Sequence, residues 1–162
     1  KEQVINSIPA IQPVANKDLT RMASGYGYRM DPFYHTFSFH QGMDFTADYG
    51  AEVYATGDGV VQNSMNDGWG YGNHVIINHG FGYTTLYGHL SRIVVRPGQA
   101  VKRGQLIGNV GSTGRSTGPH LHYEVRKNGN PLNPAFFYHN DLSDEQYRRM
   151  LEMSKRETKR FD

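Results

Sequence analysis

Short runs of β-forming residues, separated by glycines, fill the middle of the chain and restrict it to a small set of folds. Runs of four to six residues bounded by turn residues are typical of strands in antiparallel sheets or sandwiches. Asn128-Gly129 adds a strong signal for a two-residue hairpin turn. The sequence therefore predicts a mainly β, antiparallel fold, with strands at Glu52–Thr56, Gly59–Ser64, His74–Asn78, Tyr83–Tyr87, Arg92–Val95, Gln105–Val110 and Leu121–Arg126.

The C-terminal region predicts a helix that begins at Ser143. Ser143 and Gln146 have the spacing of a capping box, and Leu142 and Tyr147 have that of a hydrophobic staple. A narrow apolar stripe follows at i, i+3, i+4 and i+7, which favours packing of the helix on the sheet. The stripe comprises Tyr147, Met150, Leu151 and Ser154.

The chain of 162 residues is expected to form one domain with two short extensions. Residues 1–16 contain Pro9 and Pro13 and predict an irregular lead-in, and Asp18–Ala23 could form one helical turn. We divide the chain into a lead-in segment (1–19), a main domain (20–138) and a C-terminal helical extension (139–162).

Composition narrows the setting but does not identify the function. The net charge of +2 is mildly basic, which could favour an anionic polymer such as the cell wall or could be ordinary surface charge. The absence of cysteine fits an extracytoplasmic protein without disulfides, as well as many cytosolic ones. The sequence has no apolar run of 18 residues and no signal-like segment. It begins at Lys1, as expected of a mature or trimmed chain, and an export signal or membrane anchor could lie upstream.

Histidines and one aspartate recur at spacings suited to a metal site. Without cysteine, His and Asp must supply the ligands, and a catalytic zinc leaves one of four positions to water. On a strand, His120 and His122 share a face, with Cα atoms about 7 Å apart. His40 and Asp44 would lie about 13 Å apart if their segment were extended. They can therefore share an ion only if the chain turns at Gly42.

Several glycine-rich and histidine-containing segments follow one another along the chain: Ser24–Arg29, His40-x-x-x-Asp44, Gly50–Ala55, Gly57–Val61, Tyr71–Asn73, Tyr87–Leu90, Gly98–Gly108 and Gly111–Val125. This ordered set of motifs resembles the M23 peptidases, the lysostaphin and LytM type of zinc endopeptidases that cut peptidoglycan cross-links. The resemblance covers about residues 20 to 135 and implies a fold of the duplicated hybrid, or barrel-sandwich hybrid, type with an open groove.

Carried over position by position, the resemblance implies one zinc ion (Zn²⁺) bound by His40, Asp44 and His122. It makes His89 and His120 the catalytic pair, with one as general base and the other as a donor to the oxyanion or the leaving amine. The resemblance does not assign these two roles individually.

Five further residues are candidates for the substrate groove or its support. Glu124 is in phase with His120 and His122, and could orient a histidine or be an exposed strand carboxylate. Asn73 could bridge the groove wall or serve the backbone of its turn. Arg29 could bind a substrate carboxylate or pin the N-terminal segment. Tyr87 and Ser116 complete this set, Ser116 within a glycine-rich loop that we expect to form a groove wall.

The expected function is zinc-dependent hydrolysis of peptide cross-links in bacterial peptidoglycan, in the periplasm, cell envelope or medium. The expected partners are stem or cross-bridge peptides and not nucleic acid. One alternative is a non-catalytic scaffold or amidase activator of the same fold, although such relatives have lost ligands. Another is a sugar phosphocarrier with a related fold and two active-site histidines, which would not need Asp44. The motif does not distinguish Gly-Gly bridges from D-Ala-diaminopimelate links.

Overall fold

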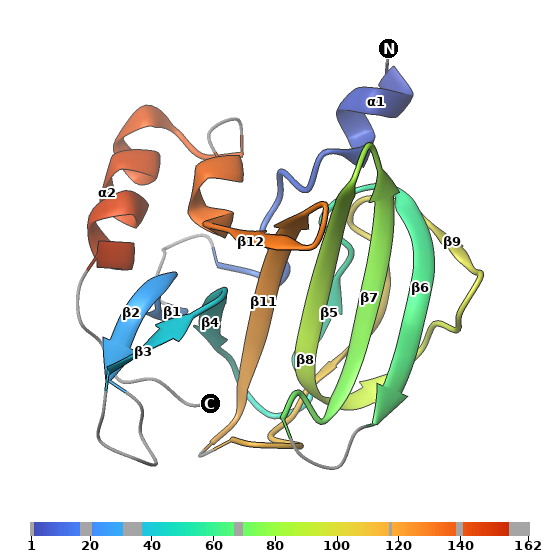
Figure 1. Cartoon of the computed structure of the whole chain (residues 1–162), viewed down its shortest axis with the longest axis horizontal. Helices are drawn as coiled ribbons and strands as arrows, with labels where there is room; N and C mark the ends of the chain where they lie inside the picture. The colour runs from blue at the N-terminus through green and yellow to red at the C-terminus, as the bar shows by residue number, and fades with distance from the viewer. Residues whose placement is uncertain are drawn as a thin grey trace.

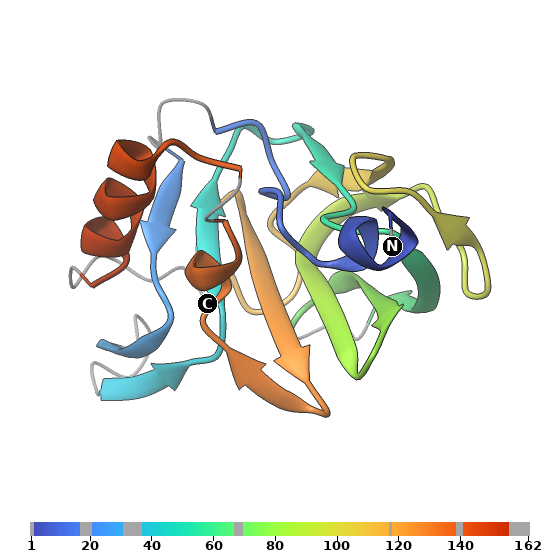
Figure 2. The same cartoon turned by 90° about the horizontal axis from the view of Figure 1, so that it is seen from above.

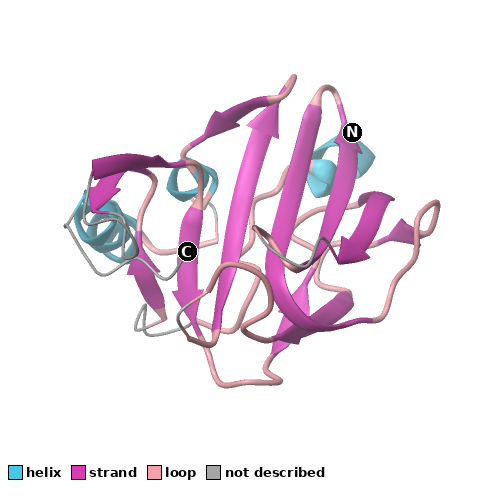
Figure 3. Cartoon of the chain, turned by 60° about the horizontal axis from the view of Figure 1, so that its bottom comes forward, coloured by secondary structure: helices cyan, strands magenta, loops and turns pink. Residues whose placement is uncertain are grey.

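The computed structural model describes residues 2–16, 21–30, 37–66, 70–116, 118–138 and 141–155. Strands are the main regular structure in this part of the chain (Figure 3), in agreement with the mainly β prediction. The strands are β1 (Met22–Ser24), β2 (Gly27–Met30), β3 (Phe37–His40), β4 (Met43–Thr46), β5 (Glu52–Tyr54), β6 (Gly59–Asn66), β7 (Asn73–Gly80), β8 (Tyr83–Ile93), β9 (Ala100–Val101), β10 (Leu106–Val110), β11 (His120–Lys127) and β12 (Asn130–Leu132). The helices are α1 (Glu2–Ser7), the 3-10 turn η1 (Pro134–Phe137) and α2 (Asp144–Lys155).

Ten strands form one antiparallel sheet, with the order β1-β4-β11-β8-β7-β6-β9 along its main path. The long strand β8 serves two parts of this sheet. Its first half pairs with β7 and β11 (Figure 1), whereas residues 90–93 pair with β10, which also pairs with β5. The sheet therefore folds over a shared core instead of remaining a flat layer.

Alternation along the central strands places one set of side chains in this core. On β11 the core residues are Leu121, Tyr123 and Val125, all fully buried. Even-numbered residues of the same strand point to the opposite face, because successive strand side chains alternate. That opposite face carries the histidines.

Helices α1 and α2 lie well apart along the sheet (Figure 2), with α2 beside β1. Helix α2 contacts η1 and β1, and its residue Met150 is fully buried. The predicted cap is confirmed, because the backbone N–H of Gln146 donates to Ser143 and that of Ser143 donates to the Gln146 side chain. The Asn128-Gly129 hairpin between β11 and β12 is also confirmed.

Three local predictions are wrong. Residues 2–7 form helix α1, where an irregular lead-in was expected. The two prolines of this segment, at positions 9 and 13, lie beyond the C-terminal end of the helix and do not interrupt it. Ala23 lies in β1, paired with β4, and not in a helical turn, while residues 17–20 lie outside the described part of the chain. The runs expected at 83–87 and 92–95 form the single strand β8 up to Ile93.

Candidate metal centre

Strand β11 brings the predicted site together. His120 and His122 share a face of this strand, and both are buried, with exposed fractions of 0% and 3%. Its neighbour β4 sets Asp44 directly opposite His122, and its other neighbour β8 sets Gly88 opposite the same residue. Three adjacent strands thus converge on His122.

His40, Asp44 and His122 place one potential ligand atom each around a common point. His40 Nε2 lies 3.2 Å from Asp44 Oδ1 and 3.2 Å from His122 Nδ1. His122 Nδ1 lies 3.0 Å from the same Asp44 oxygen. Neighbouring ligand atoms in a tetrahedral zinc site are separated by about 3.3 Å, given metal–ligand bonds near 2.0–2.1 Å. The three side chains therefore fit a zinc-sized ion with little rearrangement.

In His40 and His122, the ring nitrogen that faces away from Asp44 lies next to an oxygen acceptor. His40 Nδ1 lies 2.8 Å from the carbonyl oxygen of Gly25, and His122 Nε2 lies 2.7 Å from Glu124 Oε2. Each nitrogen can satisfy its acceptor only as an N–H donor. The other nitrogen of each neutral ring then keeps a lone pair, and that nitrogen faces Asp44.

Gly42 makes the His40–Asp44 pairing possible. The chain bends here between β3 and β4, as the spacing of the two ligands requires. A side chain at Gly42 would also collide with β11, because a Cβ atom would lie only 2.1 Å from the carbonyl oxygen of Tyr123. The position thus needs glycine for close approach to the neighbouring strand, in addition to the bend.

His89 reaches the same cluster through an irregularity in β8. By strict alternation it would point into the core, since Gly88 is the residue opposite His122. The register between β7 and β8 shifts at this point, and His89 has a positive φ of 61°. This extra residue acts as a β-bulge and turns the imidazole to the metal face.

His89 and His120 form a second pair beside the three candidate ligands. Their ring centroids are 4.6 Å apart, and both side chains are fully buried. His89 Nδ1 lies 2.7 Å from the carbonyl oxygen of Thr113, and His120 Nδ1 lies 2.9 Å from that of Gly118. These carbonyls favour the tautomer with the proton on Nδ1, which leaves Nε2 of each ring as a proton acceptor.

Glu124, Tyr71 and Arg126 form a hydrogen-bonded and charged network on the side of His122 that faces away from Asp44. Glu124 is 1% exposed, accepts from the Tyr71 hydroxyl at 2.6 Å and pairs with Arg126 at 2.6 Å. Burial raises the pKa of Glu124, but the hydrogen bonds from His122 and Tyr71 and the charge of Arg126 outweigh it and hold the pKa at about 2. Burial and the Glu124 charge raise the pKa of Tyr71 to about 12, so its hydroxyl remains a donor.

This network places Glu124 against a histidine, and it adds two residues that the sequence reasoning did not single out. Arg126 continues the i, i+2 series of His120, His122 and Glu124, so its phase on the strand was an available signal. Tyr71 stacks on the His122 ring with centroids 5.5 Å apart. It comes from a turn before β7, and no spacing in the sequence relates it to β11.

Replacing Glu124 with glutamine should weaken metal binding about 10- to 100-fold, because the negative charge that polarises His122 is lost. A titration against a competing chelator measures this change. Glu152→Gln on the exposed side of α2 is the matched control and should leave the affinity unchanged. Equal affinities for Glu124→Gln and the unmodified protein would contradict an orienting role for Glu124.

The side chains of Asn73 and Ser116 both make hydrogen bonds within the protein. The Asn73 side chain donates to the carbonyl oxygen of Leu90 at 3.0 Å, so it serves the backbone. The Ser116 hydroxyl lies 3.2 Å from His120 Nδ1 and helps to hold that ring. Arg29 has its backbone in β2, opposite Ser38, but its side chain lies outside the described residues.

Tyr87 does not line the groove, which corrects the expectation from the sequence. It is fully buried opposite Tyr123, on the core face of β8. Its hydroxyl accepts from the backbone N–H of Thr56 at 3.1 Å and from the Thr85 hydroxyl at 2.8 Å. The motif Tyr87–Leu90 therefore sends its tyrosine and its histidine to opposite faces.

Tyr87→Phe should lower the free energy of unfolding by about 1–3 kcal/mol, because buried donors lose their acceptor. Chemical denaturation measures this change, and zinc content should stay constant. Tyr54→Phe is the control, since that hydroxyl bonds to exposed Glu52, and the expected change is within about 0.5 kcal/mol. If Tyr87→Phe lost activity but kept its stability, Tyr87 would have a role in the active site, and the assignment of this residue to the core alone would be wrong.

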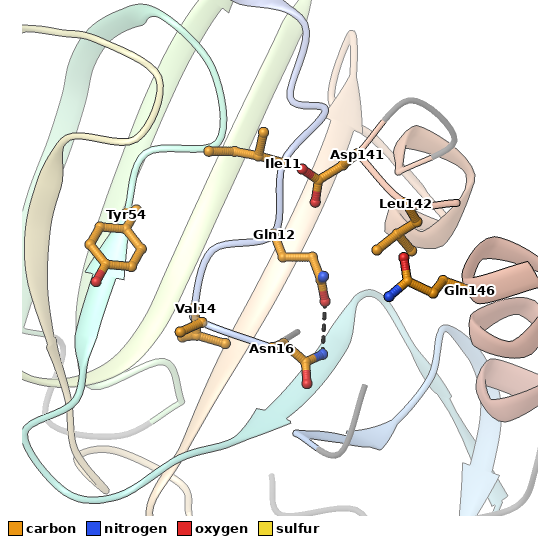
Figure 4. A pocket seen from close by; sticks show the side chains of 9 residues that line it. Ile11, Gln12, Val14, Asn16, Tyr54, Asp141, Leu142 and Gln146 are labelled. Atoms are coloured by element: carbon orange, nitrogen blue, oxygen red, sulfur yellow. Dashed lines mark hydrogen bonds between the residues drawn. The ribbon is translucent and has the colours of Figure 1, made fainter. Parts of the chain in front are cut away.

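Two hollows differ in their chemistry. One of about 240 Å³ opens over the histidine cluster and is lined by His89 and His122, with Phe39, Gln41, Gly70, Tyr71, Arg115 and Glu124. A larger one of about 700 Å³ lies between the N-terminal segment and the start of α2 (Figure 4). Gln12 and Asn16 bond to each other there at 2.7 Å, and no histidine lines it. The smaller hollow is therefore the candidate active site.

Comparison with known proteins identifies relatives of this chain. DD-carboxypeptidase/endopeptidase Mpg of Neisseria meningitidis is 53% identical over 116 residues, which are 72% of this chain and 26% of that protein. Peptidoglycan DD-endopeptidase ShyA of Vibrio cholerae is 50% identical over 105 residues, 65% of this chain and 24% of that protein. The chain thus spans about a quarter of the length of these curated relatives.

A crystal structure of a zinc-containing peptidase from Vibrio cholerae superimposes with a TM-score of 0.69. It is 42% identical, and the match covers 76% of this chain and 38% of that one. The sequence profile described as peptidase family M23 matches residues 38–134, which include all five histidine and aspartate residues of the cluster. The chain belongs to peptidase family M23.

Proposed function

We propose that this chain is the catalytic unit of a zinc-dependent endopeptidase that hydrolyses peptide cross-links of bacterial peptidoglycan. The observation that carries the proposal is the triangle of His40, Asp44 and His122, with its ligand atoms 3.0–3.2 Å apart. The names of Mpg and ShyA support the reaction class, and that of ShyA also supports the substrate. Because peptidoglycan lies outside the cytoplasmic membrane, we place the activity in the cell envelope.

Zinc bound by these three residues would supply a Lewis acid that polarises the scissile carbonyl and lowers the pKa of water. Two neutral imidazoles and one carboxylate would leave the site with a net charge of +1. No cysteine competes for the ion, since the chain has none. The donor set and its spacing thus suit zinc.

His89 and His120 would handle the protons of the reaction. Their Nδ1 atoms are held by backbone carbonyls, so their Nε2 atoms are the groups able to accept a proton from water. Once protonated, either imidazole can donate to the developing oxyanion or to the leaving amine. The M23 site lacks the glutamate base of HExxH enzymes, which leaves this work to the histidine pair.

The described residues contain no helix long and apolar enough to cross a membrane. The groove over the histidines is expected to take its substrate from the aqueous side. Tyr71 and Phe39 border this groove and offer aromatic surface to a peptide backbone.

Incubating the purified protein with bacterial sacculi tests the proposal. Released muropeptides should be identified by mass spectrometry, with bound zinc measured by elemental analysis. Cleavage that a chelator stops and zinc restores is the expected result. Binding to sacculi without cleavage by zinc-loaded protein would favour the scaffold alternative, and absence of zinc binding would favour the phosphocarrier alternative.

A further inference from the structure

Tyr71 contacts two parts of the candidate active site that come from different strands. Its ring stacks on that of His122 on β11, with centroids 5.5 Å apart and an interplanar angle of 22°. Its backbone carbonyl oxygen accepts the N–H of His89 on β8 at 2.7 Å. One residue in the turn before β7 therefore joins a candidate zinc ligand to a candidate proton-transfer group.

The hydroxyl of Tyr71 makes a third connection, to the carboxylate that His122 contacts. It donates to Glu124 Oε2 at 2.6 Å, and this same oxygen lies 2.7 Å from His122 Nε2. Arg126 donates to the Tyr71 hydroxyl at 3.2 Å and pairs with the other carboxylate oxygen at 2.6 Å. Glu124 is therefore held at both oxygens, and Tyr71 sets the position of the oxygen that contacts His122.

The carbonyl contact supports the irregular part of β8. His89 has a positive φ of 61°, a strained conformation that persists only where the surrounding structure holds it. The bond from its N–H to Tyr71 lies where the register of β7 and β8 shifts. Gly88 packs against the same turn, since a Cβ atom there would lie 3.5 Å from the Tyr71 carbonyl oxygen. Tyr71 thus helps to hold the bulge that turns His89 to the metal face.

The turn that carries Tyr71 is fixed in its own right. The N–H of Asn73 donates to the Thr113 hydroxyl at 3.0 Å, and the Thr113 carbonyl oxygen lies 2.7 Å from His89 Nδ1. Gly72 has a positive φ, and a Cβ atom there would lie 2.4 Å from the Thr113 carbonyl carbon. Tyr71 therefore acts from a rigid backbone, as precise placement of active-site groups requires.

We infer that Tyr71 is a positioning residue, which holds the zinc ligand His122 and the proton-transfer residue His89 in a fixed relation to each other. This inference rests on the proposed function. The hydroxyl acts on the metal through Glu124, and the ring and backbone act on the geometry of the two histidines. Tyr71 also lines the hollow, but Glu124 and Arg126 engage its hydroxyl, which is therefore not the group offered to a substrate.

Zinc affinity, measured against a competing chelator, tests the role of the hydroxyl without reference to activity. Tyr71→Phe keeps the ring and should bind zinc about 3- to 10-fold more weakly, less than the loss from Glu124→Gln because Arg126 still holds the carboxylate. The combined variant should match Glu124→Gln within about twofold, because the hydroxyl acts through that carboxylate. Tyr54→Phe, which removes a hydroxyl bonded to exposed Glu52, should leave the affinity unchanged.

Removing the ring tests the second role. At saturating zinc, Tyr71→Ala should lower kcat on a purified muropeptide dimer by about tenfold or more, because small displacements of catalytic groups are costly. KM should change little, since the substrate does not depend on the hydroxyl or the ring for binding. Tyr71→Phe should restore kcat, because it returns the ring to its place on His122.

Circular dichroism establishes that each variant is folded. Unchanged or tighter zinc binding by Tyr71→Phe, or additive losses in the combined variant, would overturn the inference and leave the proposed function in place. So would a Tyr71→Ala variant that keeps its kcat and raises only KM, as expected of a substrate contact. If the unmodified protein binds no zinc, or binds zinc and cuts no dimer, the proposed function fails and the inference falls with it.

Discussion

Replacing His122 with alanine should abolish stoichiometric zinc binding and reduce cross-link hydrolysis to background, while the protein stays folded. The change removes one of three ligands, and the two that remain cannot hold the ion in a closed geometry. The core of the sheet, which includes Tyr123 and Leu121 on the opposite face of β11, does not depend on the imidazole. Elemental analysis, circular dichroism and release of muropeptides measure the three quantities.

The matched control for this variant is His79→Ala. His79 is also a buried strand histidine, bonded to the Asp58 carbonyl oxygen and the Thr85 hydroxyl, but it lies outside the metal cluster. It should lose stability and keep its zinc. A His122→Ala protein that is unfolded under conditions where His79→Ala is folded would show that the metal site is structural.

His89→Ala should retain one zinc per chain and lose activity by about a hundredfold or more, the usual size of an acid–base or oxyanion contribution. The structure supports this separation because His89 reaches the cluster from the bulge in β8, outside the ligand triangle. Steady-state rates on purified muropeptides, with metal analysis of the same samples, measure both effects.

The pH–rate profile adds a second readout for His89→Ala. If His89 titrates during turnover, one limb of the profile should flatten in the variant. If it only donates a hydrogen bond, the profile should keep its shape at a lower height. Loss of zinc in this variant would instead make His89 a ligand and overturn the assignment of the catalytic pair.

Strand phase made part of this site predictable from the sequence. His120 and His122 had to share a face of β11, and the bend at Gly42 had to bring His40 towards Asp44. These are consequences of local geometry, and local geometry is what a sequence pattern records.

The rest of the site depends on contacts between distant segments. The register shift that reorients His89 arises from the pairing of β7 with β8, and alternation alone would have sent this residue into the core. The sequence predicts Tyr87 in the groove, whereas its hydroxyl bonds inside the core to Thr56 and Thr85. The stacking of Tyr71 on His122 likewise joins residues about fifty positions apart.

The bend at Gly42 has a consequence for local opening of the protein. His40 ends β3, which pairs only with β2 in the described part of the chain, whereas Asp44 and His122 belong to the large sheet. A bound ion would therefore link a small, weakly anchored sheet to a large, stable one. Amide hydrogens of Phe39 and His40 should exchange faster when the metal is removed, because opening of β3 would no longer require release of the ion. Amides in the centre of β11 are held by the core and should keep their protection. Metal occupancy would then control how often β3, at the edge of the groove, opens.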